Sequence, residues 1–349
     1  MNNKTINEDR IVLLESALSK ASMDNKTVII AIVNKAYVEG DNGKRMLDLF
    51  LEGFRVGEDT QGLSSHLLLV AVDQTSFERC KFLWLNCYKL ETDGVDFTGE
   101  KVYMSRDFIN MMWRRTLFLG EVLKRGYSFI FTDTDVLWLR NPFHRLSNNQ
   151  SIDLQISTDN FNGDPRSKTN PINTGFYMVR SNNKTISLFD AWYARKNSSQ
   201  GMKEQDVLQG KIKEGIFGEL KLTVRFLDTL YFSGFCEDSK DFRAVTSVHA
   251  NCCRTIDAKV ADLTAVIRDW KRFRSSRSFS NSNQTSAISA TAMNVYAQVN
   301  AIPMLNGMNF KVWKENMEIV LGCMDLDLAL RTERPTATTE NLNTNKIEK

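Results

Sequence analysis

The sequence predicts an α/β protein with a single, mainly parallel sheet flanked by helices. Short apolar runs such as TVIIAIV (27–33) and HLLLVAV (66–72) carry apolar residues on both faces, as fully buried parallel strands do. Stretches with apolar residues at helical spacing separate such runs. This alternation of strand and helix favours a parallel sheet joined by right-handed crossovers. With 349 residues, the chain is long enough for one large domain or two smaller ones.

The elements of the first half follow in order. Between the two strands, MLDLFLEGF (46–54) has apolar residues at helical spacing, and another helix is expected over 77–85. A longer helix is predicted within RDFINMMWRRTLFLGEVLKRGY (106–127). Gly126 is expected to end it, because glycine readily adopts the left-handed conformation found after helices. The segment SFIFTDTDV (128–136) then continues as a strand.

The second half is less regular. We expect strands at TGFYMVR (174–180) and LTVRFL (222–227), with helices over 186–193, from 204 onward and over 257–270, the last capped by Asp257. The segment RSSRSFSNSNQTSAISATA is rich in Ser, Asn and Ala and lacks apolar periodicity. It predicts a disordered linker over 274–293, between a main domain at 1–273 and a short tail at 294–349.

Composition and short motifs argue against several classes of protein. The net charge of +3 gives no reason to expect nucleic-acid binding. No uncharged apolar run approaches the ~18 residues of a membrane span, and MNNKTINEDR lacks the apolar stretch of a signal peptide. The sequence contains no CxxC spacing, so a zinc site is not expected. Cys80 and Cys87 are close enough to pair, and Cys236 could pair with Cys252 or Cys253.

Two aspartates follow the apolar run FIFT and raise the question of which cation they serve. Asp133 and Asp135 stand where their strand reaches the carboxyl edge of the sheet, the edge at which α/β proteins bind ligands. A spacing of two puts both carboxylates on one side. Such hard oxygen ligands suit Mg²⁺ or Mn²⁺, which often take further ligands from phosphates. The alternative is a solvated turn whose aspartates cap a short helix near Pro142.

Two enzyme classes place a DxD motif at the end of a strand. Phosphatases of the haloacid dehalogenase type use the first aspartate as nucleophile, usually near the N-terminus, and need a later Lys and a paired-Asp motif. This chain contains no DD dipeptide, and its DxD comes after at least two strand–helix units. Nucleotide-sugar transferases place the motif after several such units, as here. In them the metal stabilises the departing diphosphate.

A series of segments carries a closer resemblance. In order they are TVIIAIVNKAY, MLDLFLEGFRVGE, LLLVAVDQTSFERC, GVDFTGEKVYMS, MMWRRTLFLGEVLKRGYSFIFTDTDVLWLRNPF, NTGFYMVRSNNKTI, EQDVLQ, RFLDTLYFSGFCE and VHANCCRTIDAKVADL. Together, over about residues 25–273, they resemble the plant nucleotide-diphospho-sugar transferase family, glycosyltransferase family 77. The resemblance implies a GT-A (Rossmann-like) fold, retaining transfer from a UDP-sugar donor with Mn²⁺ (or Mg²⁺), and residence in the Golgi lumen. The acceptors it implies are plant cell-wall glycans or hydroxyproline-rich glycoproteins.

The resemblance also implies a metal site. Its ligands would be Asp133, Asp135 and His249, with Asp133 also near the donor. Without the resemblance, a lone histidine such as His249 is more simply a satisfied core residue.

Further residues are implied in donor and acceptor binding. Asn34 would lie in the uridine pocket, Arg114 or Arg115 would reach the diphosphate, and the loop with Asn173 and Gly175 would lie under the donor sugar. From pattern alone, the arginines could equally form surface ion pairs, and the loop could be an ordinary turn.

Two polar residues are implied near the reacting carbon. These are Gln205 and Asp206, which pattern alone would place in the first turn of a helix, where acidic residues favour the helix dipole. We expect front-face attack assisted by the leaving phosphate, with double displacement through Asp206 as the alternative.

The C-terminal tail resembles a different protein. The segment VYAQVNAIPMLNGMNFKVWKENMEIVLGCMDLDLALRTERPTATTENLN resembles the start of the Gag polyprotein of copia-type retrotransposons, over about 294–349. The leading hypothesis is therefore a glycosyltransferase domain fused to a Gag fragment. An inactive fused product is the alternative, and a DxD phosphatase is a weaker one.

Overall fold

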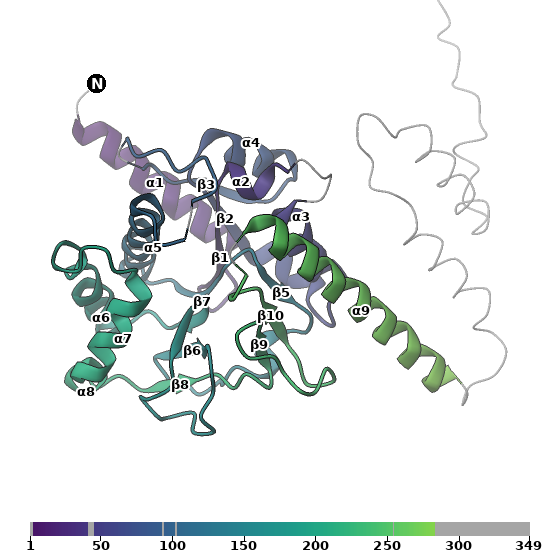
Figure 1. The fold of residues 1–349 in the computed structure, drawn as a ribbon. Coiled ribbons are helices and arrows are strands. Elements are labelled where there is room, and N and C mark those ends of the chain that lie inside the picture. Colours follow the sequence, from purple (N-terminus) through teal and green to yellow (C-terminus); the bar gives the residue numbers. More distant parts are fainter. Residues whose placement is uncertain (1–2, 41–44, 93, 102, 254, 283–349) are drawn as a thin grey trace, which may run out of the picture. The chain divides into compact units, whose positions relative to one another are not determined.

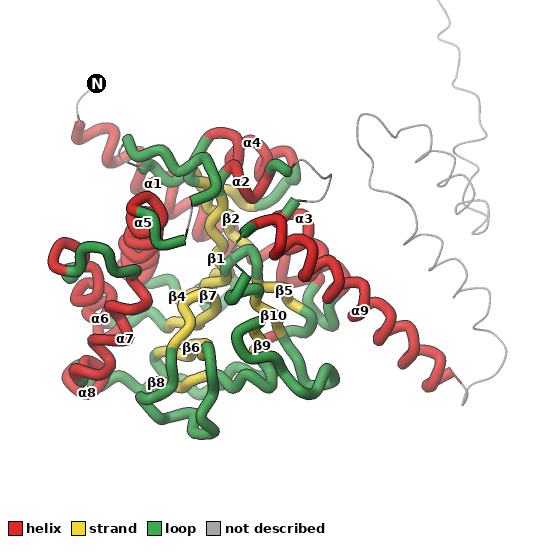
Figure 2. The backbone as a smooth tube through the Cα atoms, in the orientation of Figure 1, coloured by secondary structure: helices red, strands yellow, loops and turns green. Residues whose placement is uncertain are grey.

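A computed structural model describes residues 3–40, 45–92, 94–101, 103–253 and 255–282 (Figures 1 and 2). The helices are α1 (Asn3–Ala21), α2 (Lys35–Val38), α3 (Met46–Val56), α4 (Gln74–Phe82), α5 (Arg106–Lys124), α6 (Asn183–Tyr193), α7 (Glu204–Glu214), α8 (Ile216–Glu219) and α9 (Ile256–Ser282). The strands are β1 (Thr27–Val33), β2 (Leu67–Ala71), β3 (Asn86–Lys89), β4 (Ser128–Thr132), β5 (Val136–Trp138), β6 (Leu154–Thr158), β7 (Ile172–Val179), β8 (Val224–Phe226), β9 (Phe232–Gly234) and β10 (Ser247–His249). Among the described helices, none is long and apolar enough to cross a bilayer.

A mainly parallel sheet forms the centre, as the sequence predicts. Its strand order is β3-β2-β1-β4-β7-β6-β8. Strand β7 pairs antiparallel with both β4 and β6, whereas the other pairings in this sheet are parallel. A smaller sheet of three strands has the order β5-β10-β9.

The sheet separates two apolar layers, and alternate residues of β1 point into each. Val28 and Ile30 pack into the layer with α1, α5, α6 and α7, whereas Ile29 and Ala31 face the layer that holds α3 and the small sheet. Figure 1 shows α5, α6 and α7 to the left of the central sheet and β5, β9 and β10 to its right. All of β1 except Ile32 is buried, which explains why its sequence is apolar on both faces.

Most predicted elements are confirmed, and α5 ends as expected: Gly126 has φ +79° just beyond it. The helix expected over 77–85 ends earlier, at Phe82, because the chain turns at Trp84 (φ +56°) into β3. The capping role expected of Asp257 is wrong, since α9 begins at Ile256 and the Thr255 hydroxyl accepts the Ala258 N–H at 3.3 Å.

The structure describes only the first part of the predicted linker, and none of the predicted tail. Helix α9 continues to Ser282, so the start of the segment expected as a disordered linker is helical. The rest of that linker and the Gag-like segment 294–349 lie outside the described residues.

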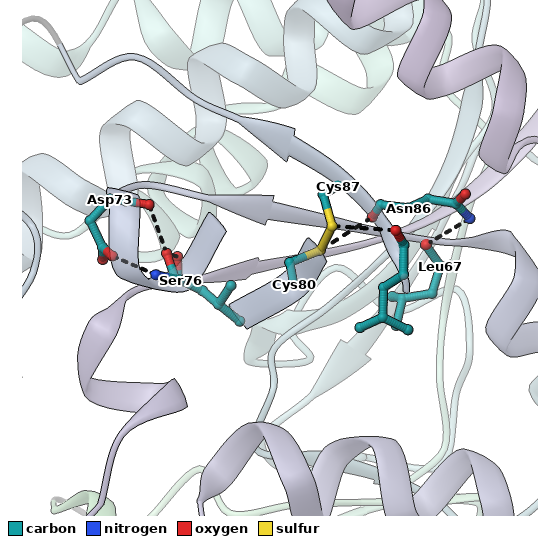
Figure 3. Close-up of a disulfide and its surroundings, with 8 residues drawn as sticks. Leu67, Asp73, Ser76, Cys80, Asn86 and Cys87 are labelled. Atoms are coloured by element: carbon teal, nitrogen blue, oxygen red, sulfur yellow. Dashed lines mark hydrogen bonds between the residues drawn. A yellow bond between two sulfur atoms is a disulfide. The ribbon is translucent and has the colours of Figure 1, made fainter. Parts of the chain in front are cut away.

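A disulfide between Cys80 and Cys87 fastens α4 to β3 (Figure 3). At the other end of α4, the Asp73 carboxylate accepts the Ser76 N–H at 2.8 Å and the Lys35 N–H at 2.6 Å. Asp73 therefore ties the start of α4 to the start of α2, directly after Asn34. This fixes the segment that follows β1 at the edge of the sheet.

Candidate active site

Polar residues follow three strands of the central sheet at one edge. Asn34 follows β1, Asp133 follows β4 and Asp159 follows β6. Because β7 runs in the opposite direction, its first residues, which include Asn173 and Gly175, lie at the same edge. These residues line a cavity of about 390 Å³, a volume typical of small-molecule sites.

The predicted DxD motif forms a turn rather than continuing its strand. β4 ends at Thr132, the Val136 N–H donates to the Asp133 carbonyl at 3.2 Å, and β5 begins at Val136. The Asp133 N–H also donates to the Gly175 carbonyl at 2.7 Å. This turn directs both carboxylates toward the cavity that they line.

His249 joins the two aspartates through the small sheet. In the pairing of β10 with β5 it lies opposite Val136, the residue directly after Asp135. Its Nε2 atom is 3.4 Å from Asp135 Oδ1. Ligand atoms of Asp133, Asp135 and His249 all lie within 4.8 Å of one another. The structure thus brings together the three residues predicted to hold a metal.

Gly175 makes room for this cluster. A Cβ atom at this position would lie 2.2 Å from His249 Cε1 and 2.9 Å from both Asp133 Oδ2 and Asn173 Oδ1. Real Cβ contacts are longer, so another residue here would displace these side chains. The absence of a side chain at Gly175 is therefore part of the geometry of the cluster.

Arg115 is buried and holds Asp133. Its guanidinium lies 2.9 Å from Asp133 Oδ1 and 2.5 Å from Glu204 Oε1, and it stacks over Phe131. It also donates to the Thr174 hydroxyl at 3.2 Å. The Asp133 side chain keeps 33% of its surface exposed. Burial nevertheless raises the pKa of Asp133 above its ordinary value, against the opposing effect of Arg115.

Asp135 is more deeply buried and is paired with a different cation. Its Oδ2 atom lies 2.5 Å from the ammonium of Lys259, on the first turns of α9. Burial alone would raise the pKa of Asp135, but Lys259 and His249 outweigh it and hold that pKa well below its usual range. Asp135 is thus an anion that is already paired with the positive charge of Lys259.

The donor set fits a hard divalent cation. Two carboxylates and one imidazole converge beside a position that has no side chain, and Asp133 is accessible from the cavity. Oxygen and imidazole ligands of this kind suit Mn²⁺ and Mg²⁺.

The two residues of the predicted catalytic pair lie in different surroundings. Gln205 lines the cavity, and its Oε1 atom accepts the Thr174 N–H at 3.0 Å. Asp206 is exposed on the first turn of α7, 3.8 Å from the Lys203 ammonium, and it does not line the cavity.

Asn34 and Arg114 also line the cavity. Asn34 is almost fully buried, and its amide donates to the carbonyls of Phe97 and Gly99 at 2.7 and 3.1 Å. Arg114 donates to the carbonyl of Glu91. Their predicted contacts with the donor stay predictions.

Sequence reasoning missed three charged residues of the site. Asp159 follows the buried strand β6, the same signal that identified Asp133, but the predicted elements did not include this strand. Glu204 directly precedes Gln205 and was overlooked beside it. Lys259 carries no local signal, because α9 brings it to Asp135 from far along the chain.

Comparison with known proteins agrees with this geometry. Residues 62–263 match the family model described as nucleotide-diphospho-sugar transferase. The chain is 59% identical over 266 residues to the Arabidopsis thaliana protein named "Uncharacterized protein At1g28695", covering 75% of this chain and 79% of the relative. It is 32% identical over 124 residues to beta-arabinofuranosyltransferase RAY1 of the same plant, covering 32% of this chain and 23% of the relative.

Among solved structures, the galactosyltransferase LgtC, in complex with donor and acceptor sugar analogs, is 12% identical with a TM-score of 0.41, covering 68% of this chain and 95% of that one. From the family match and the strong likeness to the first Arabidopsis relative, the chain is a member of the nucleotide-diphospho-sugar transferase family, and it has the GT-A α/β fold.

Proposed function

We propose that this chain is a metal-dependent, retaining glycosyltransferase of family 77. It transfers a pentose or hexose from a UDP-sugar to a plant cell-wall glycan or a hydroxyproline-rich glycoprotein. The observation that carries the proposal is the cluster of Asp133, Asp135 and His249 in the cavity at the carboxyl edge of the sheet. In a nucleotide-diphospho-sugar transferase, such a cluster serves the diphosphate of the donor.

Each part of the edge has a role in this proposal. Asp133, Asp135 and His249 hold Mn²⁺ or Mg²⁺, which supplies positive charge to the departing diphosphate when bound. Asn34 belongs to the nucleoside end of the cavity, with Arg114 beside the donor. Asn173 and Gly175 lie under the sugar.

Arg115 has a positioning role in this scheme. Its guanidinium contacts Asp133, Glu204 and Thr174 at once. It therefore joins the metal-binding turn to the start of α7, where Gln205 is located. A buried, multiply bonded arginine of this kind keeps two parts of a site in fixed relation.

The surroundings of Asp206 support front-face attack rather than double displacement. A nucleophilic carboxylate must reach the anomeric carbon, but Asp206 is exposed and lies outside the cavity lining. We therefore propose that the acceptor hydroxyl attacks on the face that the diphosphate leaves, and that a leaving phosphate oxygen takes its proton. Gln205, held by Thr174, lies where it can bind polar groups near that carbon.

The sugar proposed is consistent with one relative. The name of the arabinofuranosyltransferase reported above supports a pentose donor. Family membership also favours a transferase over the phosphatase alternative. The Gag-like segment is proposed to contribute no catalytic group, so a chain that ends at Ser282 should keep the activity.

The test is release of UDP from UDP-arabinofuranose, UDP-xylose and UDP-galactose, with Mn²⁺ or with EDTA. We expect release that needs Mn²⁺, is lost in Asp135→Ala and persists in Asp241→Ala, a matched change at an exposed aspartate. Folded protein that releases no UDP from any of these donors, and that shows no Mn²⁺-dependent UDP binding, would support the inactive product. Release of phosphate from an aryl phosphate would instead support the phosphatase.

A further inference from the structure

We propose that Asp159 determines the sugar specificity of this site. Its carboxylate accepts hydrogen bonds from hydroxyls of a neutral sugar ring and disfavours sugars that carry a carboxylate. This inference rests on the proposed function. It is carried by three amide side chains that converge on the one carboxylate of Asp159, in the cavity and outside the metal cluster.

The three amides come from separate parts of the chain. Asn173, at the start of β7, donates to Asp159 Oδ1 at 2.7 Å. Asn251, just after β10, donates to the same oxygen at 2.8 Å. Gln205, on α7, lies 3.5 Å from Asp159 Oδ2. All four residues line the cavity.

The orientation of each amide is fixed from its other side. The oxygens of Asn173, Gln205 and Asn251 accept the backbone N–H groups of Gly175, Thr174 and Cys236, at 2.8, 3.0 and 3.1 Å. Since a backbone N–H can only donate, each amide must present its NH₂ group to Asp159.

The two carboxylate oxygens therefore have different roles. Oδ1 is occupied by two short hydrogen bonds, whereas Oδ2 receives only the long contact from Gln205 among the described side chains. An ionised carboxylate has about four acceptor positions. Asp159 is half-buried in a cavity wall, so the remaining positions on Oδ2 can accept from a ligand.

The location of Asp159 indicates which part of the ligand it meets. Asn173 bonds Asp159 through its NH₂ and the Gly175 backbone through its oxygen, and Gly175 touches the metal cluster. Asp159 is thus one side chain away from the metal ligands. A group that follows the diphosphate would reach this position, and in a nucleotide sugar that group is the sugar.

The chemistry then selects the ligand. Ring hydroxyls of a pentose or hexose donate to a fixed carboxylate oxygen without carrying charge, which makes a strong hydrogen bond. A uronic acid would place a second carboxylate nearby and be repelled. The hydroxyl could belong to the donor sugar or to the acceptor sugar, and the experiment separates the two.

The experiment compares the full-length protein with its Asp159→Ala and Asp159→Asn variants. With Mn²⁺ present, calorimetry measures the Kd of UDP, of UDP-xylose and of UDP-glucuronate, and kinetics measure the acceptor KM and acceptor-independent UDP-xylose hydrolysis. Asp241→Ala is the matched control. Circular dichroism and thermal unfolding confirm that the variants fold.

If Asp159 binds the donor sugar, the Kd of UDP-xylose rises about 10- to 100-fold in Asp159→Ala. The Kd of UDP then stays within about twofold of the wild-type value. If Asp159 binds the acceptor sugar, the acceptor KM rises by a similar factor and acceptor-independent hydrolysis of UDP-xylose is unchanged. In both cases, wild type prefers a neutral sugar over its uronate counterpart, and Asp159→Asn narrows that preference.

Two results would overturn the inference. In one, folded variants keep the wild-type Kd, KM and neutral-sugar preference. In the other, UDP and UDP-xylose affinities fall together, which would mean that Asp159 merely supports the cavity wall. A wild-type protein that binds no UDP with Mn²⁺ would instead contradict the proposed function itself, and this inference with it.

Discussion

Replacing Gly175 by alanine adds one methyl group at the most crowded point of the site. That methyl would lie 2.2 Å from His249 Cε1, and 2.9 Å from Asp133 Oδ2. An ordinary carbon–carbon contact is about 3.5–4.0 Å. Since Gly175 is fixed in β7 by its neighbours, the imidazole has to retreat by more than 1 Å, roughly the difference between these distances.

Such a displacement has two measurable consequences. Overpacking a buried site costs about 1–3 kcal/mol of unfolding free energy. His249 would also leave the position from which it faces Asp133 and Asp135, and loss of one ligand should weaken Mn²⁺ binding by at least about tenfold. The effect on metal binding should exceed the effect on stability.

Isothermal titration with Mn²⁺ and urea unfolding measure both quantities on the same variants. The control is Gly210→Ala, because Gly210 lies inside α7 and an added Cβ there meets no atom within 4 Å. That change should stabilise the protein by about 0.5–1 kcal/mol through helix propensity and leave Mn²⁺ affinity unchanged. Wild-type Mn²⁺ affinity in Gly175→Ala would refute the close packing of Gly175 against His249 and Asp133.

Three further predictions concern the surroundings of the site. Lys259→Met should tighten Mn²⁺ binding about tenfold in titrations without nucleotide, because its ammonium competes for Asp135 Oδ2; weaker binding would contradict this competition. Replacing Cys236 and Cys252 by serine opens the disulfide beside Asn251. It should lower unfolding free energy by about 3 kcal/mol for a loop of this length and weaken UDP-sugar binding, and unchanged affinity would contradict the second effect. Replacing the cysteines of the other disulfide, between α4 and β3, should cost about 2 kcal/mol in urea unfolding and leave UDP-sugar affinity as in wild type; a change in that affinity would be unexpected.

Elements with strong local patterns could be predicted from the sequence. β1 was predicted with its bounds because nearly every residue is apolar and buried. A cation site at the DxD motif was predicted because a carboxylate pair after such a strand is costly without a cation, whereas the turn that holds the pair was not predicted. β3 was missed because this edge strand, NCYK, is only half-buried and lacks an apolar run. The direction of β7 was also missed, since an apolar strand has the same pattern in either direction.

Site residues that depend on tertiary contacts were harder to predict. The pairing choice left open for Cys236 is settled by β9 and β10, whose parallel pairing brings it to Cys252 and leaves Cys253 without a disulfide partner among the described cysteines. Lys259 and Asp135 are distant in sequence, and no local pattern connects them. The exposure of Asp206 depends on which side of α7 faces the cavity, and the first turn of a helix does not reveal this.

The most direct test of the central claim is Mn²⁺ binding measured by electron paramagnetic resonance in the presence of UDP. The claim is that Asp133, Asp135 and His249 form one divalent-metal centre that serves a nucleoside diphosphate. It predicts one bound Mn²⁺ per chain, affinity that rises when UDP is added, and loss of that signal in Asp135→Asn and His249→Ala. Equal Mn²⁺ binding in these folded variants and in wild type would contradict it.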